Sequence, residues 1–239
     1  MAHEIRTTPR ERRRDANLEK ILEAAMGMVA DGGLEALSMN RLAAAVDYTP
    51  GALYRYFDSK DALLSRLVAR TLEEVRAELD RAVAALPAPA SPLAKVFALV
   101  AGYRAYARRE PHRFGLLAST MAAPRVLLPA PRDAEPVVVV MVAAMQPLAD
   151  ALAAAAAAGL ISAGEVAERT VCVFALLQGV LLLHKQARYA PGILDGDRLS
   201  ARGIRALLVG WGARPRAVDA AIARVARLRD AAGRAQGAA

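Results

Sequence analysis

Apolar residues recur at helical spacing along most of the chain. Leu18, Ile21, Leu22, Ala25 and Val29 fall on one face of a helix, and the pair Gly32-Gly33 then ends it. Ala and Leu are abundant, whereas β-branched runs are few. The only strand-like run, 137–140, continues into a helical window and is predicted to begin a buried helix. The pattern predicts an all-α fold.

Proline and glycine divide the rest of the chain into further helices. They are predicted at residues 60–85, 93–109, 111–121, 137–158, 163–189, 199–211 and 215–232. A loop with Pro124, Pro129, Pro131 and Pro136 is expected to precede the helix that starts at Val137. We predict two domains: residues 1–60, an N-terminal arm and a small helical domain, and residues 61–239, a larger all-helical domain.

The segment from Ser38 to Leu64 predicts a helix-turn-helix. Ser38 can cap a short helix, and Asp47-Tyr48 interrupts its apolar pattern. Thr49-Pro50 then supplies an N-cap and a proline at the first helical position of a second helix, expected to reach Phe57. Gly51 and the following alanine leave the start of that helix bare, so it can approach another surface closely. Such a helix suits the DNA major groove.

The block PGALYRYF followed by DSKDALL resembles the DNA-binding signature of TetR-type transcriptional regulators. The resemblance covers about residues 17–67 and is more specific than a general helix-turn-helix. The family usually has Gly-Val in the turn where this chain has Asp47-Tyr48. Asp tolerates the left-handed conformation, so we expect the turn to persist. The acidic group could weaken DNA binding, and Tyr48 needs more space than valine.

The resemblance implies roles for individual residues on double-stranded DNA. Phosphates are expected to be held by Ser38, Arg41, Tyr54, Tyr56 and Lys60. Residues expected to face the bases or lie beside them are Asn40, Thr49, Pro50, Gly51, Ala52 and Arg55. Arginines 6, 10, 12, 13 and 14 form a basic arm that can be a solvated tail, can order on DNA, or both.

The resemblance also implies a small-molecule effector site in the second domain and a homodimer built from its last two major helices. Candidate effector contacts are polar or flexible side chains at positions expected to be core. They are Tyr103, Tyr106, Phe114, Met121, Met141, Met145, Phe174, Gln178 and His184. Ordinary packing is the simpler interpretation of each one. Gln178 is the most informative, because a buried amide needs partners, which a ligand or a second subunit could supply.

The net charge of +8 is not by itself a DNA-binding signal. Most of it comes from the segment after residue 200, which has eight arginines and two aspartates. A solvated face on the last helix accounts for them, and a second nucleic-acid surface is disfavoured because no aromatic residues interleave. DNA affinity must therefore come from the local placement of charges in the N-terminal domain.

The sequence lacks the motifs that are typical of other functional classes. The single cysteine, Cys172, excludes an internal disulfide and is expected to be a buried, inert thiol. We find no metal-ligand spacing, P-loop, dinucleotide fingerprint or nucleophile elbow, so we predict no enzyme activity, no metal and no cofactor. The uncharged windows are shorter than a membrane helix requires, and no signal peptide is evident, so we predict a cytoplasmic protein without membrane contact.

These observations lead to one main interpretation and one alternative. The main interpretation is a ligand-responsive regulator, a repressor, that binds a pseudo-palindromic operator as a homodimer and is released by a small apolar or amphipathic effector. The alternative is a helical small-molecule-binding or adaptor protein with weakened or no DNA binding, for which Asp47-Tyr48 is the only support in the sequence.

Overall fold

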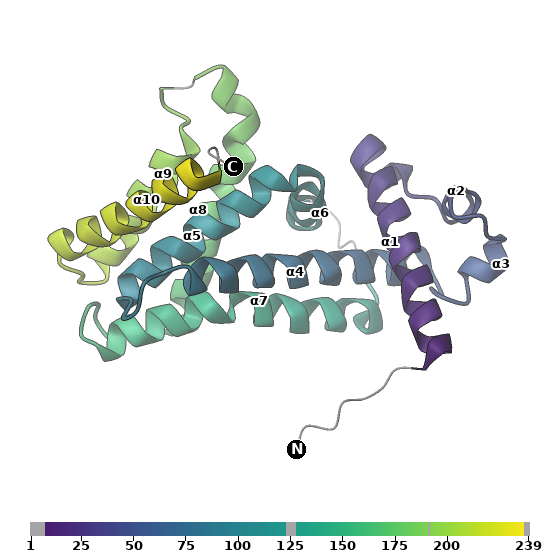
Figure 1. Cartoon of the computed structure of the whole chain (residues 1–239), viewed down its shortest axis with the longest axis horizontal. Helices are drawn as coiled ribbons and strands as arrows, with labels where there is room; N and C mark the ends of the chain where they lie inside the picture. Colours follow the sequence, from purple (N-terminus) through teal and green to yellow (C-terminus); the bar gives the residue numbers. More distant parts are fainter. Residues whose placement is uncertain (1–7, 123–127, 191, 237–239) are drawn as a thin grey trace. The chain divides into compact units, whose positions relative to one another are not determined.

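The structure is a computed structural model that describes residues 8–122, 128–190 and 192–236, and within these ranges it contains helices and no strand. Figure 1 shows α1 (Pro9–Ala36), α2 (Met39–Ala45), α3 (Pro50–Leu53), α4 (Lys60–Ala84), α5 (Pro92–Arg109), α6 (Pro111–Ala122), α7 (Pro131–Ala157), α8 (Val166–Leu182), the 3-10 helix η1 (Leu183–Arg188), α9 (Gly196–Gly210) and α10 (Pro215–Gln236). The predicted all-α class, a helix-turn-helix followed by a larger helical part, is confirmed.

The chain divides into two compact units that interleave in sequence. The first unit runs to Thr71 and resumes over Pro111–Val139, and the second contains Leu72–Glu110 and Val140 onward. Both α4 and α7 therefore run from one unit into the other. The domain division at residue 60 follows the order of the motifs and stays a prediction.

The core of the first unit joins α1 to the short helices that follow it. Ile21, Leu22 and Ala25 of α1 are at most 1% exposed, as are Leu42 of α2 and Leu53 of α3. The backbone leaves helical geometry at Gly32-Gly33, where Gly33 has φ 70°. The predicted end of the first long helix is thus a break, and one further turn follows it. The helix α6 also packs on α1.

The second unit is built around α5. Nearly every residue of this helix from Leu93 to Ala107 is buried, and α5 contacts both α8 and α10. The helix α9 packs on α8 and on α10 (Figure 1). A side chain at Gly203 of α9 would bring its Cβ within 2.6 Å of the Leu176 side chain on α8. The absence of a side chain therefore permits the close approach of these two helices.

Several predicted helix boundaries are wrong, and several side chains that were predicted to be buried are exposed. Pro136 lies inside α7, which begins at Pro131, so the helix continues past this proline at the cost of one helix hydrogen bond. The run at 137–140 is not a buried helix start, since Val138 and Val139 are 49% and 69% exposed. The helix predicted at residues 163–189 ends at Leu182 and gives way to η1. Cys172 is exposed.

The prediction that no segment is long and apolar enough to cross a membrane used too strict a criterion. By length and composition α7 is apolar enough to cross a membrane, with a window of mean hydropathy 1.9 that is 22% buried. A search for windows without any charged residue missed α7, because a membrane-spanning window can contain an occasional charged residue. The core helix of a soluble protein meets the same criteria, so this property alone does not indicate a membrane.

Candidate nucleic-acid interface

The turn between α2 and α3 takes the left-handed conformation that the sequence predicted. Asp47 has φ 63°, and the amide of Tyr48 donates to the carbonyl of Ala43 at 2.8 Å. The ammonium group of Lys20, on α1, donates to the carbonyl of Val46 at 3.1 Å and to the Asp47 carboxylate at 3.3 Å. The acidic residue that replaces the usual glycine therefore has a cation from α1 beside it.

The helix α3 begins as expected and ends early. The hydroxyl of Thr49 accepts from the amide of Ala52 at 3.2 Å, and Pro50 stands at the first helical position. Regular helix ends at Leu53, four residues before the predicted end, and a turn then leads to Phe57. Leu53 and Phe57 are 0% and 6% exposed, so these two side chains anchor the segment in the core.

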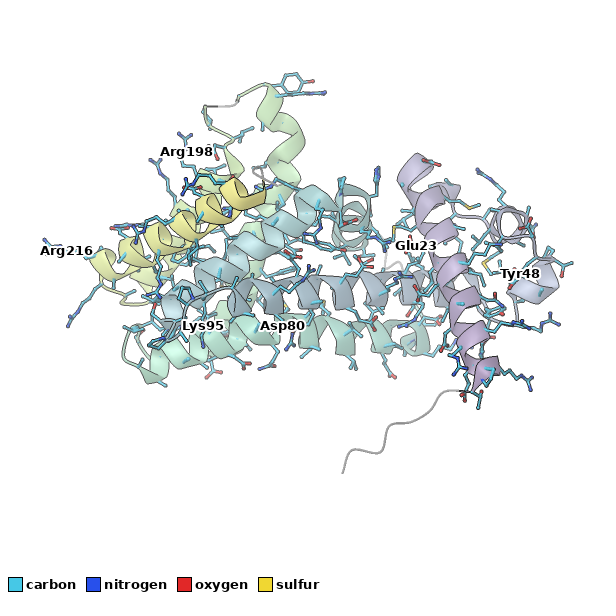
Figure 2. The ribbon with its side chains drawn as sticks, in the orientation of Figure 1. Glu23, Tyr48, Asp80, Lys95, Arg198 and Arg216 are labelled. Carbon is cyan, nitrogen blue, oxygen red and sulfur yellow. The ribbon has the colours of Figure 1, made fainter. Side chains whose placement is uncertain are left out.

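Tyr48 stacks on Tyr56, which lies three residues after the end of α3. Its ring lies 6.0 Å from the ring of Tyr56, with 20° between the planes. The hydroxyl of Tyr56 accepts a hydrogen bond from the side-chain amide of Asn17, on α1, at 3.3 Å. Partial desolvation and the neighbouring Tyr56 hydroxyl raise the pKa of Tyr48 above its ordinary value. Tyr48 is only half-buried (Figure 2), so it is accommodated at the edge of the core and not inside it.

The residues predicted to contact DNA are accessible on α2, α3 and the start of α4. Those that are exposed are Asn40, Arg41, Thr49, Pro50, Gly51, Tyr54, Arg55 and Lys60, and those that are half-buried are Ser38, Ala52 and Tyr56. Ser38 stands at the N-cap of α2, but its hydroxyl makes no capping bond, contrary to the prediction. The ammonium group of Lys60 lies 3.4 Å from the carbonyl of Leu34. Their roles on DNA stay predictions.

Sequence reasoning missed Asn17 and Lys20. Both lie on α1, three residues apart, and both reach the helix-turn-helix. The available signal for Lys20 was Asp47, since an acidic residue in this turn needs a counter-charge. Nothing in the sequence indicated Asn17, whose partner is Tyr56 and not a residue of the turn.

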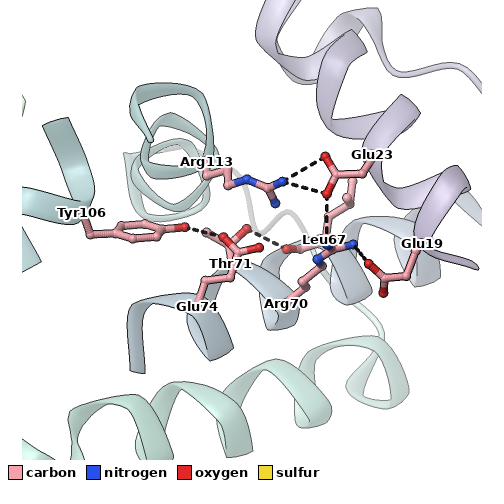
Figure 3. A network of polar contacts seen from close by, with 8 residues as sticks. All are labelled: Glu19, Glu23, Leu67, Arg70, Thr71, Glu74, Tyr106 and Arg113. Atoms are coloured by element: carbon pink, nitrogen blue, oxygen red, sulfur yellow. Dashed lines mark hydrogen bonds and ion pairs between the residues drawn. The ribbon is translucent and has the colours of Figure 1, made fainter. Parts of the chain in front are cut away.

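A network of charged side chains joins three helices of the first unit (Figure 3). The guanidinium of Arg113 on α6 donates to both oxygens of Glu23 on α1, at 2.8 and 3.0 Å. Arg70 on α4 pairs with the same Glu23 at 2.9 Å and also with Glu19. The positive charges of the two arginines balance the negative charges of the two glutamates. The side chains of Arg113 and Arg70 are only 16% and 20% exposed. The network fixes α6 and the first part of α4 to α1.

In the second unit, two of the candidate effector contacts bond each other. The hydroxyl of Tyr103 on α5 donates to the amide oxygen of Gln178 on α8 at 2.9 Å. The ring of Phe174 lies beside the Tyr103 ring, with 6.1 Å between the two ring centroids. Burial raises the pKa of Tyr103 well above its ordinary value. Gln178 therefore has a partner within its own chain, whereas the sequence interpretation had considered a ligand or a second subunit. Tyr106 also has a partner, because its hydroxyl donates to Glu74 at 3.0 Å.

The other candidate effector contacts differ in their unit and in their burial. Phe114 lies on α6 and belongs to the first unit, not the second. Met141 is 37% exposed on α7, contrary to the expectation of a core position, and Met145 is half-buried. The side chains of Met121 and His184 lie outside the described part of the structure.

Comparison with known proteins agrees with this arrangement in both parts of the chain. The profile of bacterial regulatory proteins of the tetR family matches residues 21–67, and that of the tetracyclin repressor-like C-terminal domain matches residues 96–207. The chain belongs to the TetR family. This membership supports the prediction that the protein is not an enzyme, because TetR regulators are DNA-binding proteins without catalytic activity.

Individual relatives of this TetR-family chain show where the similarity is concentrated. The transcriptional repressor KstR of Mycolicibacterium smegmatis is 41% identical over 76 residues, which cover 32% of this chain and 35% of KstR. The match thus spans about a third of the length of that relative. A tetR-family regulatory protein from Rhodococcus RHA1 has a TM-score of 0.61 and is 18% identical, covering 83% of this chain and 98% of that chain.

FadR from Bacillus subtilis, solved in complex with stearoyl-CoA, has a TM-score of 0.62 at 14% identity. That match covers 80% of this chain and 98% of the FadR chain. At these identities the solved structures establish the shared fold alone.

Proposed function

We propose that the protein is a ligand-responsive transcriptional repressor that binds a pseudo-palindromic operator as a homodimer. The observation that carries the proposal is the presentation of α3. Its buried Leu53 anchors the helix, whereas Thr49, Pro50 and Gly51 at its start are exposed. A short helix with a bare, outward-facing start fits the width of the major groove. Such a protein acts where bacterial DNA is, in the cytoplasm.

The side chains around α3 provide the two kinds of contact that operator binding needs. Arg41 on α2 and Lys60 at the start of α4 are exposed cations suited to phosphates. Arg55, which is also exposed, lies two residues after the end of α3 and is suited to reading a guanine. Phosphate contacts would set the register of the helix, and the base contacts would supply the sequence preference.

A homodimer is supported by one face of α8. The exposed positions of this face are Val171, Cys172, Ala175, Gly179, Leu182 and the adjoining Leu183, and they recur at helical spacing. A Cβ added at Gly179 would meet no atom of the chain within 4 Å. A face of small and apolar residues allows the same helix of a second copy to pack closely. Two copies would then present two α3 helices to the two half-sites of an operator.

An effector site is supported by the buried contact between Tyr103 and Gln178. A hydroxyl and an amide in an otherwise apolar layer can exchange their mutual hydrogen bond for bonds to the polar end of a ligand. The fold accommodates such a molecule in FadR, which was solved with stearoyl-CoA. We extend this to a small apolar or amphipathic effector of the present chain, whose binding would favour the state with low DNA affinity.

Selection from a randomised pool of duplex DNA, followed by affinity measurement on the enriched duplex, tests the proposal. Arg55→Ala should cost about 1–3 kcal/mol and relax preference at one base pair of each half-site. Lys60→Ala should weaken binding on all sequences and lower the salt slope by about 1 per subunit. Arg216→Ala, which removes an exposed arginine from α10 (Figure 2), is the matched control.

The alternative function, a helical small-molecule-binding or adaptor protein, predicts a different result. In that case the wild-type chain would enrich no duplex, and all three variants would behave alike. The pairing of Asp47 with Lys20 weakens the only argument for this alternative, because the carboxylate in the turn has a nearby counter-charge.

A further inference from the structure

Two residues of α1 contact the chain on either side of α3. Lys20 bonds the carbonyl of Val46 and the carboxylate of Asp47, which precede α3. Asn17 bonds the hydroxyl of Tyr56, which follows it. Asn17 and Lys20 are three residues apart on a helix, so they share one face of α1. The stacked rings of Tyr48 and Tyr56 connect the two contacts.

We infer that Lys20 and Asn17 are positioning residues that hold both ends of α3 in the orientation required for DNA binding. This inference rests on the proposed function. The bond from Lys20 to the carbonyl of Val46 satisfies an acceptor at the C-terminal end of α2, where a cation also interacts favourably with the helix dipole. Asp tolerates a positive φ better than most residues other than glycine, and the ion pair with Lys20 further holds Asp47 in this conformation.

Lys20 has a second, electrostatic effect on the same turn. The side chain of Asp47 is 89% exposed, and that of Lys20 is 55% exposed, so both charges lie at the surface. An unpaired carboxylate in this turn would repel DNA phosphates. With Lys20 at 3.3 Å, the pair carries no net charge. Lys20 thus allows an acidic residue in a turn that faces DNA.

A double-mutant cycle between positions 20 and 47 tests the inference. Lys20→Ala should weaken binding to the selected duplex by at most about fivefold, because an ion pair at the surface contributes no more than about 1 kcal/mol. Asp47→Gly needs no support at positive φ and should bind within about twofold of the wild type. Lys20→Ala added to Asp47→Gly should then cost less than Lys20→Ala alone, because only the bond to the Val46 carbonyl remains to be lost.

The salt dependence distinguishes positioning from a direct DNA contact. In the Asp47→Gly background no carboxylate is left unpaired, so loss of a positioning residue leaves the slope of log affinity against log salt unchanged, whereas loss of a phosphate contact lowers it by about 1 per subunit. Lys95→Ala, which removes a lysine from α5 in the second unit (Figure 2), controls for the change in total charge. An equal loss in both backgrounds, with a lower slope, would show that Lys20 contacts DNA itself and would overturn the inference.

A measurement without DNA separates this inference from the proposed function. Amide hydrogen exchange over residues 46–57 should become faster in Lys20→Ala and in Asn17→Ala, and Asp47→Gly should suppress the effect of Lys20→Ala. If Lys20→Ala does not fold alone, recovery of folding in the Asp47→Gly background supports the same conclusion. Unchanged exchange in both single variants would overturn it. A wild-type chain that binds no duplex but shows these exchange changes would refute only the proposed function.

Discussion

The guanidinium of Arg113 on α6 donates to both carboxylate oxygens of Glu23 on α1, at 2.8 and 3.0 Å. These residues are far apart in sequence, and their contact places α6 in the unit that contains the helix-turn-helix. The preceding helix, α5, belongs to the other unit and carries Tyr103. The chain therefore passes directly from the proposed effector site to a helix that is bonded to α1.

Replacement of Arg113 with alanine should loosen α6 from α1. The ion pair is partly buried and makes two bonds, so we expect a loss of about 1 kcal/mol, which corresponds to about fivefold faster hydrogen exchange in α1 and α6. Mass spectrometry of peptides from these two helices measures the rate of hydrogen exchange. Arg14→Ala, at an exposed position of α1, is the control. Equal exchange in the two variants would show that the Glu23–Arg113 pair does not stabilise the unit.

The effect of Tyr103 can be separated from that of Gln178. Tyr103→Phe removes the hydroxyl that bonds the Gln178 amide oxygen, so we expect a loss of about 1–2 kcal/mol in stability. The double variant with Tyr103→Phe and Gln178→Leu replaces both polar groups and should recover most of the lost stability. Trp211, the single tryptophan, lies in the second unit, so its fluorescence during urea unfolding reports on this region. A double variant no more stable than Tyr103→Phe would contradict the prediction.

The oligomeric state should depend on the exposed face of α8. Leu182→Asp places a charge at a 49% exposed position, which the isolated chain tolerates but an apolar interface does not. We expect light scattering to give the mass of a monomer for this variant and of a dimer for the wild type at micromolar concentration. Ile193→Asp, at a 71% exposed position outside α8, should remain dimeric. A wild-type monomer with full operator affinity would refute the homodimer.

Local sequence signals predicted the helices and the turn well. Thr49 and Pro50 predicted the start of α3 because an N-cap acts on amides only three residues away. Asp47 predicted the positive φ from its own conformational preference. Each of these inferences needs only neighbouring residues. The end of α3 was missed, because Tyr54, Arg55 and Tyr56 are compatible with a helix and tertiary contacts end it at Leu53.

Contacts between distant segments could not be predicted from one sequence. Leu208 illustrates this, because it lies on one of the helices expected to form the dimer, whereas its side chain is 0% exposed within the chain. An aspartate there would unfold the protein and would not test its assembly. Val171 and Leu182, on the same kind of apolar helix, are 55% and 49% exposed. Helical periodicity identifies an apolar residue but does not say which neighbour covers it.

Asp197 should make the second unit sensitive to acid. Burial opposes ionisation of this carboxyl, but its hydrogen bond with Arg104 and the charges of Arg104, Arg108 and Arg229 outweigh that effect and lower its pKa below the ordinary value. A group with a lowered pKa stabilises the folded state above its unfolded pKa, about 3.9 for aspartate, and this contribution disappears as the pH falls through the folded pKa. Asp197→Asn should therefore destabilise the protein at pH 6 and have less effect as the pH falls below about 4. The side chain is 55% exposed, so solvent screening limits the difference to about 1 kcal/mol. Urea unfolding of both proteins at several pH values, followed by Trp211 fluorescence, measures it. A difference in unfolding free energy that stays constant from pH 6 to pH 3 would show that the three arginines do not stabilise the ionised carboxyl.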